Sequence, residues 1–475
     1  MNAFVDAAVQ LPDSQTENGA ATFASSLDTH VDLFFRVGAS RGKVNEVINL
    51  FQNALKEDAK LAIRIAMWAR DARGGAGERE IFREAVKVMP RLAQIGMISK
   101  AVELGRWDDL GVLVMSDDEL VSITAAQFWK RHVLEGHGLA AKWAPRKGEL
   151  AVRLRALWQM SPKQYRKTLV NATNVVEQKM CAKQWDDIEF AHVPSVAAAR
   201  YNAAFFRNAL EKYKAYKQAL VKGEAKINAS AIFPHDVIRA AYSPYGYDTA
   251  KVDTDVVDAQ WDALPDFCNG KASDILVMSD VSGSMSLAVS GSITAMHVSI
   301  ALGLYISERQ TGPFKDLVLT FHTNPTFHKV HGKGITARAN NLGGAPWGGS
   351  TDINKAFKLI LDTAVSNSVP ANDMPKMLLI LSDMEFDAAS KLTNTQALRK
   401  MYAEAGYEMP KLVFWNLNSR SANIPVRYNE QGVALVSGFS PAILKSILSA
   451  EEFSPKQIML DTIMKERYTL PGITA

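Results

Sequence analysis

The sequence lacks long hydrophobic runs and a recognisable export signal. No apolar stretch approaches the roughly 20 residues that a helix needs to cross a bilayer, so we expect no membrane partner. The N-terminus does not place an apolar block after a basic start, as a secretory signal would. We therefore expect residues 1–28 to be a polar, flexible lead-in.

Cysteine is also scarce, with Cys181 and Cys268 the two in 475 residues. A secreted chain of this length would carry more, so we expect a reducing, cytoplasmic location with both thiols free. No CxxC pair occurs, which argues against a zinc site built from thiolates.

The motifs of common enzyme classes are absent as well. The stretch RGGAGERE (73–80) lacks the GK[ST] ending of the phosphate-binding loop in nucleotide hydrolases. No nucleophile stands beside an obvious base. We therefore predict that the protein is not an enzyme.

Charge of both signs is plentiful, but it is unevenly distributed. Residues 140–240 hold 18 Lys and Arg against 8 Asp and Glu, a net charge of +10, so the rest of the chain carries −6 of the total of +4. A basic middle in an otherwise acidic protein favours a polyanionic partner, with nucleic acid first among the candidates. A solvated helical surface rich in lysine would show the same excess.

Residues 29–246 have the pattern of helices. Apolar residues recur every three or four positions and good helix formers dominate, as at 44–72, 78–93 and 196–221. Short breaks rich in Gly, Pro, Ser or Asp separate the helical segments. Many antiparallel helices on short connections predict an N-terminal α-solenoid of HEAT-like repeats, although no clean sequence period is present.

The pattern changes after a connector at 247–271, for which we expect one short helix. From 272 to 475, short runs rich in Val, Ile, Leu and Phe alternate with helical segments. The predicted strands are 275–278, 317–322, 377–382 and 412–417, and the predicted helices between them are 293–309, 353–365 and 389–406. This alternation predicts a doubly wound α/β domain with a parallel sheet.

Polar side chains stand where two of these strands end. In ILVMSDVSGSMS (275–286), an apolar run stops at Asp280, and Ser282 and Ser284 follow at alternate positions. Ligands bind outside the carboxyl ends of the strands in such sheets. The alternate spacing in a tight loop lets all three oxygens turn the same way, and the intervening glycine permits the turn.

Two later stretches supply further oxygen ligands. The glycine-rich stretch LGGAPWGGSTDI (342–353) contains Thr351, and the run LLILSDMEF (378–386) contains Asp383. With the first three residues they form the candidate ligand set: Asp280, Ser282, Ser284, Thr351 and Asp383. Two carboxylates and three hydroxyls, without His or Cys, suit Mg²⁺, with Mn²⁺ or Ca²⁺ as alternatives.

Each part of this set has a structural alternative. A lone DxSxS is often a loop with a helix cap, and Thr351 or Asp352 could cap a helix that starts at Ile353. Asp383 alone would be an ordinary strand-end carboxylate. Three histidines (His322, His328 and His331) could bind zinc, but a surface hairpin is the favoured interpretation of FHTNPTFHKVH.

The order DVSGSMS, then Thr in GGST, then Asp at a later strand end resembles the metal-ion-dependent adhesion site of von Willebrand factor A domains. The resemblance covers 272–475. It implies that Ser282 and Ser284 bind the metal directly, and that Asp280, Thr351 and Asp383 bind it directly or through water. It also implies a free coordination position that accepts a carboxylate of a protein partner.

A helical-repeat region before an A domain resembles the TROVE-module family of Ro-like proteins, most closely a bacterial and phage branch. The phrases that carry this resemblance are RGGAGEREIF (73–82), GRWDDLGVL (105–113) and the stretch 165–205. The resemblance implies that the helices close into a ring and bind small non-coding RNAs or the single-stranded ends of misfolded RNAs.

The basic middle fits RNA binding through its spacing. Lys163, Arg166 and Lys167 share one helix face, and Lys179 and Lys183 repeat that spacing. The candidate RNA set is Lys163, Arg166, Lys167, Lys179, Lys183, Arg200, Lys212, Lys214 and Lys217. These cations would neutralise phosphates, without base-specific readout or DNA specificity.

Aromatic residues interleave with this basic surface. Tyr213 and Tyr216 could stack bases. Alternatively, these two and Phe205 are core residues of an amphipathic helix. The arginines of the region (Arg155, Arg200 and Arg207) could equally be partners of its acidic residues (Asp186, Asp187, Glu189 and Glu211).

The sequence thus predicts non-enzymatic binding of small structured or single-stranded-ended RNA by a helical surface. A metal-bearing A domain would recruit a second ligand. The alternative is a metal-dependent protein-interaction scaffold without RNA, and a metal-dependent hydrolase is a weaker third hypothesis because no base is in place.

Overall fold

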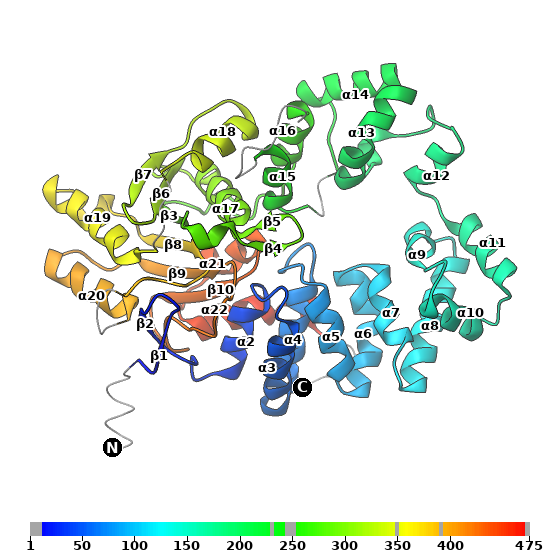
Figure 1. Ribbon diagram of the computed structural model, residues 1–475, viewed down its shortest axis with the longest axis horizontal. Helices are drawn as coiled ribbons and strands as arrows, with labels where there is room; N and C mark the ends of the chain where they lie inside the picture. Colours follow the sequence, from blue (N-terminus) through cyan, green and yellow to red (C-terminus); the bar gives the residue numbers. More distant parts are fainter. Residues whose placement is uncertain (1–11, 229–231, 243–252, 347–350, 389–392, 471–475) are drawn as a thin grey trace. The chain divides into compact units, whose positions relative to one another are not determined.

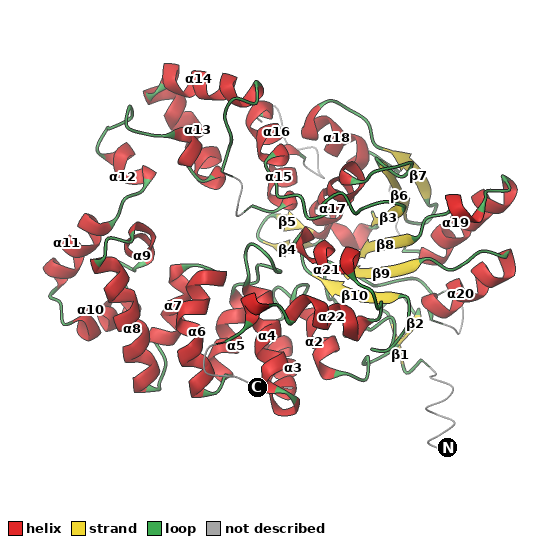
Figure 2. Ribbon diagram, turned by 180° about the vertical axis from the view of Figure 1, so that it is seen from behind, coloured by secondary structure: helices red, strands yellow, loops and turns green. Residues whose placement is uncertain are grey.

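The computed structural model describes residues 12–228, 232–242, 253–346, 351–388 and 393–470 (Figure 1, Figure 2). Among the helices in these ranges, none is long and apolar enough to cross a membrane. Cys181 is exposed and Cys268 is buried, and neither forms a disulfide.

The chain divides into two compact units. The α/β unit comprises Met1–Lys43, Phe233–Trp261 and Pro265–Ile463. The helical unit comprises Val44–Ile232, Asp262–Leu264 and Met464–Ala475. These limits differ from the predicted boundaries, because residues before Val44 and from Phe233 onward group with the sheet.

The helical unit confirms the predicted N-terminal helical region. Consecutive helices pack on one another: α3 contacts α4 and α5, α6 contacts α7 and α8, and α8 contacts α9, α10 and α11. The helices are α3 (Val44–Glu57), α4 (Ala59–Arg70), α5 (Glu80–Val88), α6 (Arg91–Leu104), α7 (Leu110–Val114), α8 (Glu119–Leu134), α9 (Gly138–Trp143), α10 (Glu149–Trp158), α11 (Pro162–Ala172), α12 (Val176–Cys181), α13 (Ser195–Asn208) and α14 (Leu210–Val221).

The long helices predicted from periodicity are each interrupted. Between α3 and α4, Asp58 leaves the helical conformation and its carboxylate accepts hydrogen bonds from the amides of Lys60 and Leu61. Pro90 precedes α6, where its missing N–H costs nothing. Ala209 separates α13 from α14 with φ −140°. Apolar periodicity continues across such breaks, so it does not reveal them.

Two sequence stretches quoted above, GRWDDLGVL (105–113) and RGGAGEREIF (73–82), have structural roles in the helical unit. The first contributes to a buried charge network, and the second contains a glycine that is packed closely against the backbone. Asp109, from GRWDDLGVL, is fully buried. Its carboxylate accepts from Nε and Nη2 of Arg70 at 2.8 and 2.6 Å, and from Nε of Arg83 at 2.8 Å. In RGGAGEREIF, a Cβ on Gly75 would lie 1.9 Å from the carbonyl oxygen of Trp68, so only glycine fits there.

The α/β unit is built on a six-stranded sheet in the order β10-β9-β8-β3-β6-β7. The strands are β3 (Ile275–Asp280), β6 (Leu317–Phe321), β7 (Thr326–Lys329), β8 (Met377–Ser382), β9 (Lys411–Asn416) and β10 (Val433–Ser437). Every pair is parallel except β6–β7. Every residue of β3, β8 and β10 is buried, so both faces of the sheet are covered, as a doubly wound domain requires.

Helices on the sheet complete the α/β unit. Helix α17 packs on β3, β6 and β8, α19 packs on β6, and α2 and α22 pack on β10. The helices are α2 (Thr29–Val37), α15 (Pro234–Ala241), α17 (Ala295–Arg309), α18 (Gly334–Gly343), α19 (Ile353–Ser366), α20 (Asn394–Ala405), α21 (Leu444–Ser449) and α22 (Pro455–Ile463). Helix α16 (Thr254–Asp262) falls in the predicted connector.

The sheet departs from the prediction at its edge. It is mixed rather than purely parallel, because β7 pairs antiparallel with β6. The histidine-rich stretch FHTNPTFHKVH forms this hairpin, as its favoured interpretation predicted, although His322 is buried rather than on the surface. His328 Nε2 lies 3.0 Å from Asn341 Oδ1, and Asn341 Nδ2 lies 3.2 Å from His331 Nε2.

The described part of the predicted lead-in is bound to the α/β unit. Two short strands, β1 (Ser14–Gln15) and β2 (Ala21–Thr22), form a hairpin. Beyond it, Phe23 and Ile424 exchange backbone hydrogen bonds of 3.0 and 2.9 Å. Residues 12–28 of the predicted lead-in thus form secondary structure and long-range hydrogen bonds, while residues 1–11 lie outside the described ranges. These long-range contacts could not be predicted from the polar composition of the segment.

Candidate metal centre and candidate RNA surface

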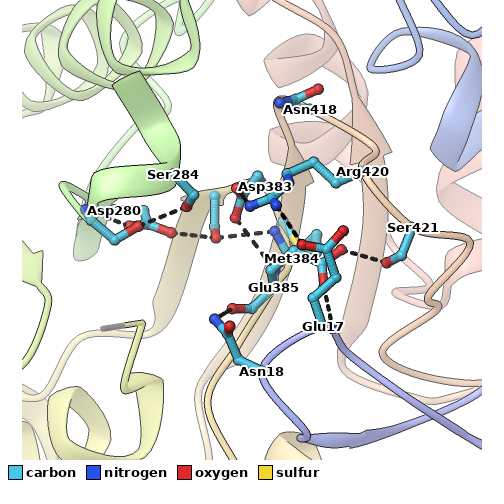
Figure 3. Close-up of polar contacts among 12 residues, drawn as sticks. Glu17, Asn18, Asp280, Ser284, Asp383, Met384, Glu385, Asn418, Arg420 and Ser421 are labelled. Atoms are coloured by element: carbon cyan, nitrogen blue, oxygen red, sulfur yellow. Dashed lines mark hydrogen bonds and ion pairs between the residues drawn. The ribbon is translucent and has the colours of Figure 1, made fainter. Parts of the chain in front are cut away.

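The first candidate site lies at the carboxyl ends of neighbouring parallel strands. Asp280 ends β3, and Asp383 directly follows β8, the adjacent strand. The next strand, β9, leads into a loop that carries Arg420 (Figure 3). Strand pairing therefore brings together residues that are about a hundred positions apart in the sequence.

Asp280 is fully buried, and protein donors hold its carboxylate. Oδ1 accepts a hydrogen bond from the amide of Ser282 at 2.9 Å, and Oδ2 accepts one from the hydroxyl of Ser382 at 2.6 Å. Burial and the nearby charge of Asp383 raise the pKa of Asp280 to about 7. Ionising both carboxyl groups is therefore costly unless a cation lies near them.

The two serines of the loop face one another. Their Oγ atoms are 3.1 Å apart, with Ser282 buried and Ser284 half-buried. Residues Gly283–Ser286 form one turn of 3-10 helix, which places the hydroxyls of the loop beside Asp280. As predicted from the spacing, the three oxygens gather in one place.

Asp383 has one carboxylate oxygen without a hydrogen-bond donor. Its Oδ1 accepts from the amide of Glu385 at 3.4 Å, whereas the buried Oδ2 accepts none. Arg420 Nη1 forms a long ion pair of 3.8 Å with Oδ2. Burial raises the pKa of the Asp383 carboxyl, and the nearby Ser284 hydroxyl and the charge of Arg420 oppose that rise.

The structure distinguishes the roles of Thr351 and Asp352. The cap of α19 is Asp352, whose Oδ1 accepts from the amide of Lys355 at 3.0 Å. Thr351 is buried, and its carbonyl accepts from the amide of Asp387, four residues beyond Asp383, at 3.0 Å. Thr351 therefore lies beside the β8 loop and is not needed as the helix cap. The preceding residues 347–350 lie outside the described ranges.

The donor set fits a hard divalent cation. The buried oxygen of Asp383 lacks a donor, and a second buried carboxylate with a raised pKa lies nearby. A cation would satisfy the first and lower the cost of ionising the second. Among the described residues, no group of three or more His, Cys, Asp and Glu side chains could hold a metal. The candidate set instead contributes two carboxylates and hydroxyl oxygens.

Four residues around this site were missed from the sequence. Ser382 donates to Asp280, and Arg420 pairs with Asp383. Glu385 is buried and accepts from the amide of Glu17, at 2.7 Å. Ser382 could have been found from its place beside Asp383, but no local pattern connects residue 17 or 420 with this edge.

The second candidate site is the cationic face of α11 in the helical unit. Lys163, Arg166 and Lys167 are all exposed, as their spacing predicted. Helix α11 contains no acidic residue, and Tyr165 and Leu169 anchor its opposite face in the core. This arrangement leaves three positive charges together on one surface.

The remaining candidate RNA residues are less available. Lys183, Arg200 and Lys214 are exposed, but Lys214 also lies 3.9 Å from Glu211. The half-buried lysines have local contacts. Lys179 donates to the carbonyl of Asp187, Lys212 donates to that of Asp186, and Lys217 lies over the ring of Phe206.

The aromatic residues near these lysines belong to the core. Phe205 and Tyr213 are buried with Phe190 in one hydrophobic cluster, and Tyr216 packs against that cluster. The interpretation of these rings as core residues is therefore correct. Two of the region's acidic residues pair with lysines rather than with the arginines considered above: Glu189 with Lys212 at 3.5 Å and Glu211 with Lys214 at 3.9 Å.

Comparisons with known proteins show similarity over most of the chain. A model described as domain of unknown function DUF2828 matches residues 16–91 and 146–269, and DUF7788, also a domain of unknown function, matches 274–469. The crystal structure of the Deinococcus radiodurans RO (RSR) protein aligns over 96% of each chain, with a TM-score of 0.36 and 14% identity. Uncharacterized protein L728 of Acanthamoeba polyphaga mimivirus is 30% identical over 520 residues, 96% of this chain and 88% of that protein. The chain belongs to the same family as this mimivirus protein.

Proposed function

We propose that the protein is a non-enzymatic binding protein whose α/β unit holds a divalent cation and docks a carboxylate of a protein partner through it. The cation would be Mg²⁺, or alternatively Mn²⁺ or Ca²⁺, held by the candidate ligand set. The observation that carries the proposal is the buried Oδ2 of Asp383, which receives no hydrogen bond.

A buried oxygen acceptor without a donor costs free energy, about 1–3 kcal/mol when neutral and more when charged. The same edge of the sheet holds the buried Asp280 and the paired hydroxyls of Ser282 and Ser284. These groups offer oxygen ligands of the kind that Mg²⁺ and Ca²⁺ prefer. When bound, the cation would supply an electrophilic position for an oxygen ligand from outside the chain.

Isothermal titration calorimetry with Mg²⁺ and Mn²⁺ tests the metal site. We expect Asp383→Asn to abolish binding, because it removes the charge of the oxygen that lacks a donor. The matched control is Asp352→Asn, which removes an equal charge nearby but preserves the α19 cap, since asparagine caps helices as well as aspartate does. Equal affinity in the two variants would refute the assignment of Asp383.

We also propose that the helical unit binds RNA through the backbone. The specific observation is the exposed face of α11, where Lys163, Arg166 and Lys167 project without an acidic residue on the same helix. The preferred ligand is a small structured RNA with a single-stranded end. Binding would depend on phosphates, because the neighbouring aromatic rings are occupied in the core.

The RNA proposal is tested by measuring affinity for such an RNA across a range of salt concentrations. Replacing Lys163, Arg166 and Lys167 with glutamine should weaken binding and flatten the salt dependence, by roughly 0.7–0.9 in slope for each phosphate that is no longer neutralised. The control replaces three exposed cations elsewhere on the helical unit, Lys56, Lys60 and Arg131. If both triple variants bind with equally reduced affinity, α11 is not the binding face.

The protein-docking alternative without RNA makes a different prediction. In that case the purified protein carries no nucleic acid, so its ratio of absorbance at 260 and 280 nm is that of protein alone. A partner recovered in Mg²⁺ and released by EDTA would then account for the α/β unit without any role for α11.

A further inference from the structure

The guanidinium of Arg420 lies between the carboxylates of Glu17 and Asp383, beside the candidate metal centre. Its Nη1 lies 3.8 Å from Asp383 Oδ2, the oxygen that receives no hydrogen bond. Its Nη2 forms an ion pair with Glu17 (Figure 3). A positive charge is thus already present beside the oxygen that a divalent cation would use.

The segment that carries Glu17 is held in place by the loops after β8 and β9. Glu385 accepts from the amide of Glu17 at 2.7 Å, and its backbone carbonyl accepts from the side chain of Asn18 at 2.7 Å. The carboxylate of Glu385 also accepts from Ser421 and Asn423. Glu17 is therefore positioned by a buried group rather than left to move freely on the surface.

The backbone of Arg420 is anchored as well, while its side chain keeps room to move. Lys43 donates to the carbonyl of Arg420, and the amide of Ser419 donates to that of Ala39 at 2.9 Å. The Arg420 side chain is 30% exposed. An arginine with a fixed backbone and a partly exposed side chain can approach Asp383 or withdraw to Glu17 without rearranging the loop.

We propose that Arg420 is a built-in competitor of the divalent cation, and that Glu17 is the acceptor that draws it away from Asp383. The inference rests on the proposed metal site. Arg420 neutralises Asp383 when the site holds no cation. Cation binding excludes the guanidinium from Asp383 by charge repulsion, and the Arg420–Glu17 pair then keeps the arginine at the rim. The N-terminal segment is thereby coupled to the state of the site.

Competition predicts opposite effects for the two partners. Arg420→Gln should tighten Mn²⁺ binding about fivefold to tenfold, the order that Coulomb's law gives for a unit charge about 5 Å from a divalent ion at water-like permittivity, with screening. Glu17→Gln should weaken binding several-fold, since it removes a nearby negative charge and frees Arg420 to stay on Asp383. Arg420→Lys keeps the charge and should bind nearly as the unmodified chain does.

The experiment measures the Mn²⁺ dissociation constant of the full chain by electron paramagnetic resonance at low salt. The matched control is Arg399→Gln, which removes the same charge from another ion pair of the α/β unit, that with Glu430. We expect this control to bind within about twofold of the unmodified chain, because the side chain of Arg399 contacts Glu430 and Gln431, which lie outside the candidate ligand set. Circular dichroism verifies that each variant is folded.

Two outcomes would overturn the inference, and they are distinguishable. If the unmodified chain binds Mn²⁺ but Arg420→Gln binds it equally or more weakly, the arginine is a structural ion pair and not a competitor. If neither the unmodified chain nor Arg420→Gln binds Mn²⁺, the metal site itself is wrong. Should Arg420→Gln fail to fold, Glu17→Gln decides, because unchanged affinity there also refutes the coupling.

Discussion

Stabilisation of the protein by a divalent cation should depend on pH through Asp280. Burial and the charge of Asp383 raise the pKa of this carboxyl from 3.8 to about 7. Between these two values the folded protein holds a proton that the unfolded chain has released. The free energy of unfolding of the metal-free protein therefore falls as the pH rises from about 4 to about 7, and this loss is complete above the folded-state pKa.

The magnitude follows from the shift. One pKa unit corresponds to about 1.4 kcal/mol, so a rise from pH 5 to pH 8 should cost the metal-free protein up to about 3 kcal/mol through this group. A cation requires the ionised carboxylate, so its apparent dissociation constant rises about tenfold for each pH unit below the folded-state pKa. A cation present at about 100 times its dissociation constant at pH 8 stabilises by about 3 kcal/mol, and the same concentration at pH 6 stabilises by roughly half as much.

Urea unfolding in EDTA and in Mg²⁺, at about pH 6 and about pH 8, measures both effects. The reference is Asp280→Asn, which cannot ionise and should lose the pH dependence of the metal-free protein. The reasoning is refuted if Mg²⁺ stabilises the unmodified chain equally at both pH values. It is also refuted if Asp280→Asn retains the original pH dependence.

Two further predictions concern the helical unit. Asp109→Ala should lower the free energy of unfolding in urea by about 3–5 kcal/mol, because it leaves the buried guanidinium of Arg70 without its partner. Asp117→Ala, at an exposed position, should change it by less than about 0.5 kcal/mol. Equal losses in the two variants would show that the buried ion pair does not stabilise the helical unit. Asp58→Ala should cost about 1 kcal/mol and Asp58→Asn almost nothing, since asparagine also caps α4; a full loss in the asparagine variant would point to the charge rather than the cap.

The central strands could be predicted because burial on both faces produces continuous apolar runs. Strands β3, β6, β8 and β9 were found this way. The edge strand β7 alternates half-buried and exposed residues, so it carries no comparable signal. Strand β10 was missed although its short apolar run is buried along its whole length. Helix interruptions were missed for a related reason, since apolar periodicity continues through Asp58 and Ala209 while the backbone does not.

The candidate ligand set could be proposed from the sequence because two of its members, Asp280 and Asp383, follow apolar runs and the order of the five residues resembles a known motif. The residues that regulate access to it could not. Glu17 and Arg420 meet Asp383 only because β8 and β9 are neighbours and the N-terminal segment crosses the loops that follow them. A polar N-terminal segment and a loop arginine carry no local sequence signal for this contact. Their contact with Asp383 can therefore be found only from the tertiary structure.

The α/β unit includes N-terminal residues that lie outside the DUF7788 match, and these residues pack against its sheet. The DUF7788 match begins at 274, yet α2 and the hairpin β1–β2 belong to the same compact unit as the sheet. The close approach is specific: the hydroxyl of Ser437 in β10 donates to the carbonyl of Phe34 at 2.8 Å, and a Cβ on Gly38 would lie 2.8 Å from the backbone of Gly438. Phe34 and Phe35 are fully buried. A fragment of residues 274–469 would therefore expose the β10 face that α2 covers and lose Glu17 beside Asp383, so the α/β unit and the proposed control of its metal site both depend on the N-terminal segment.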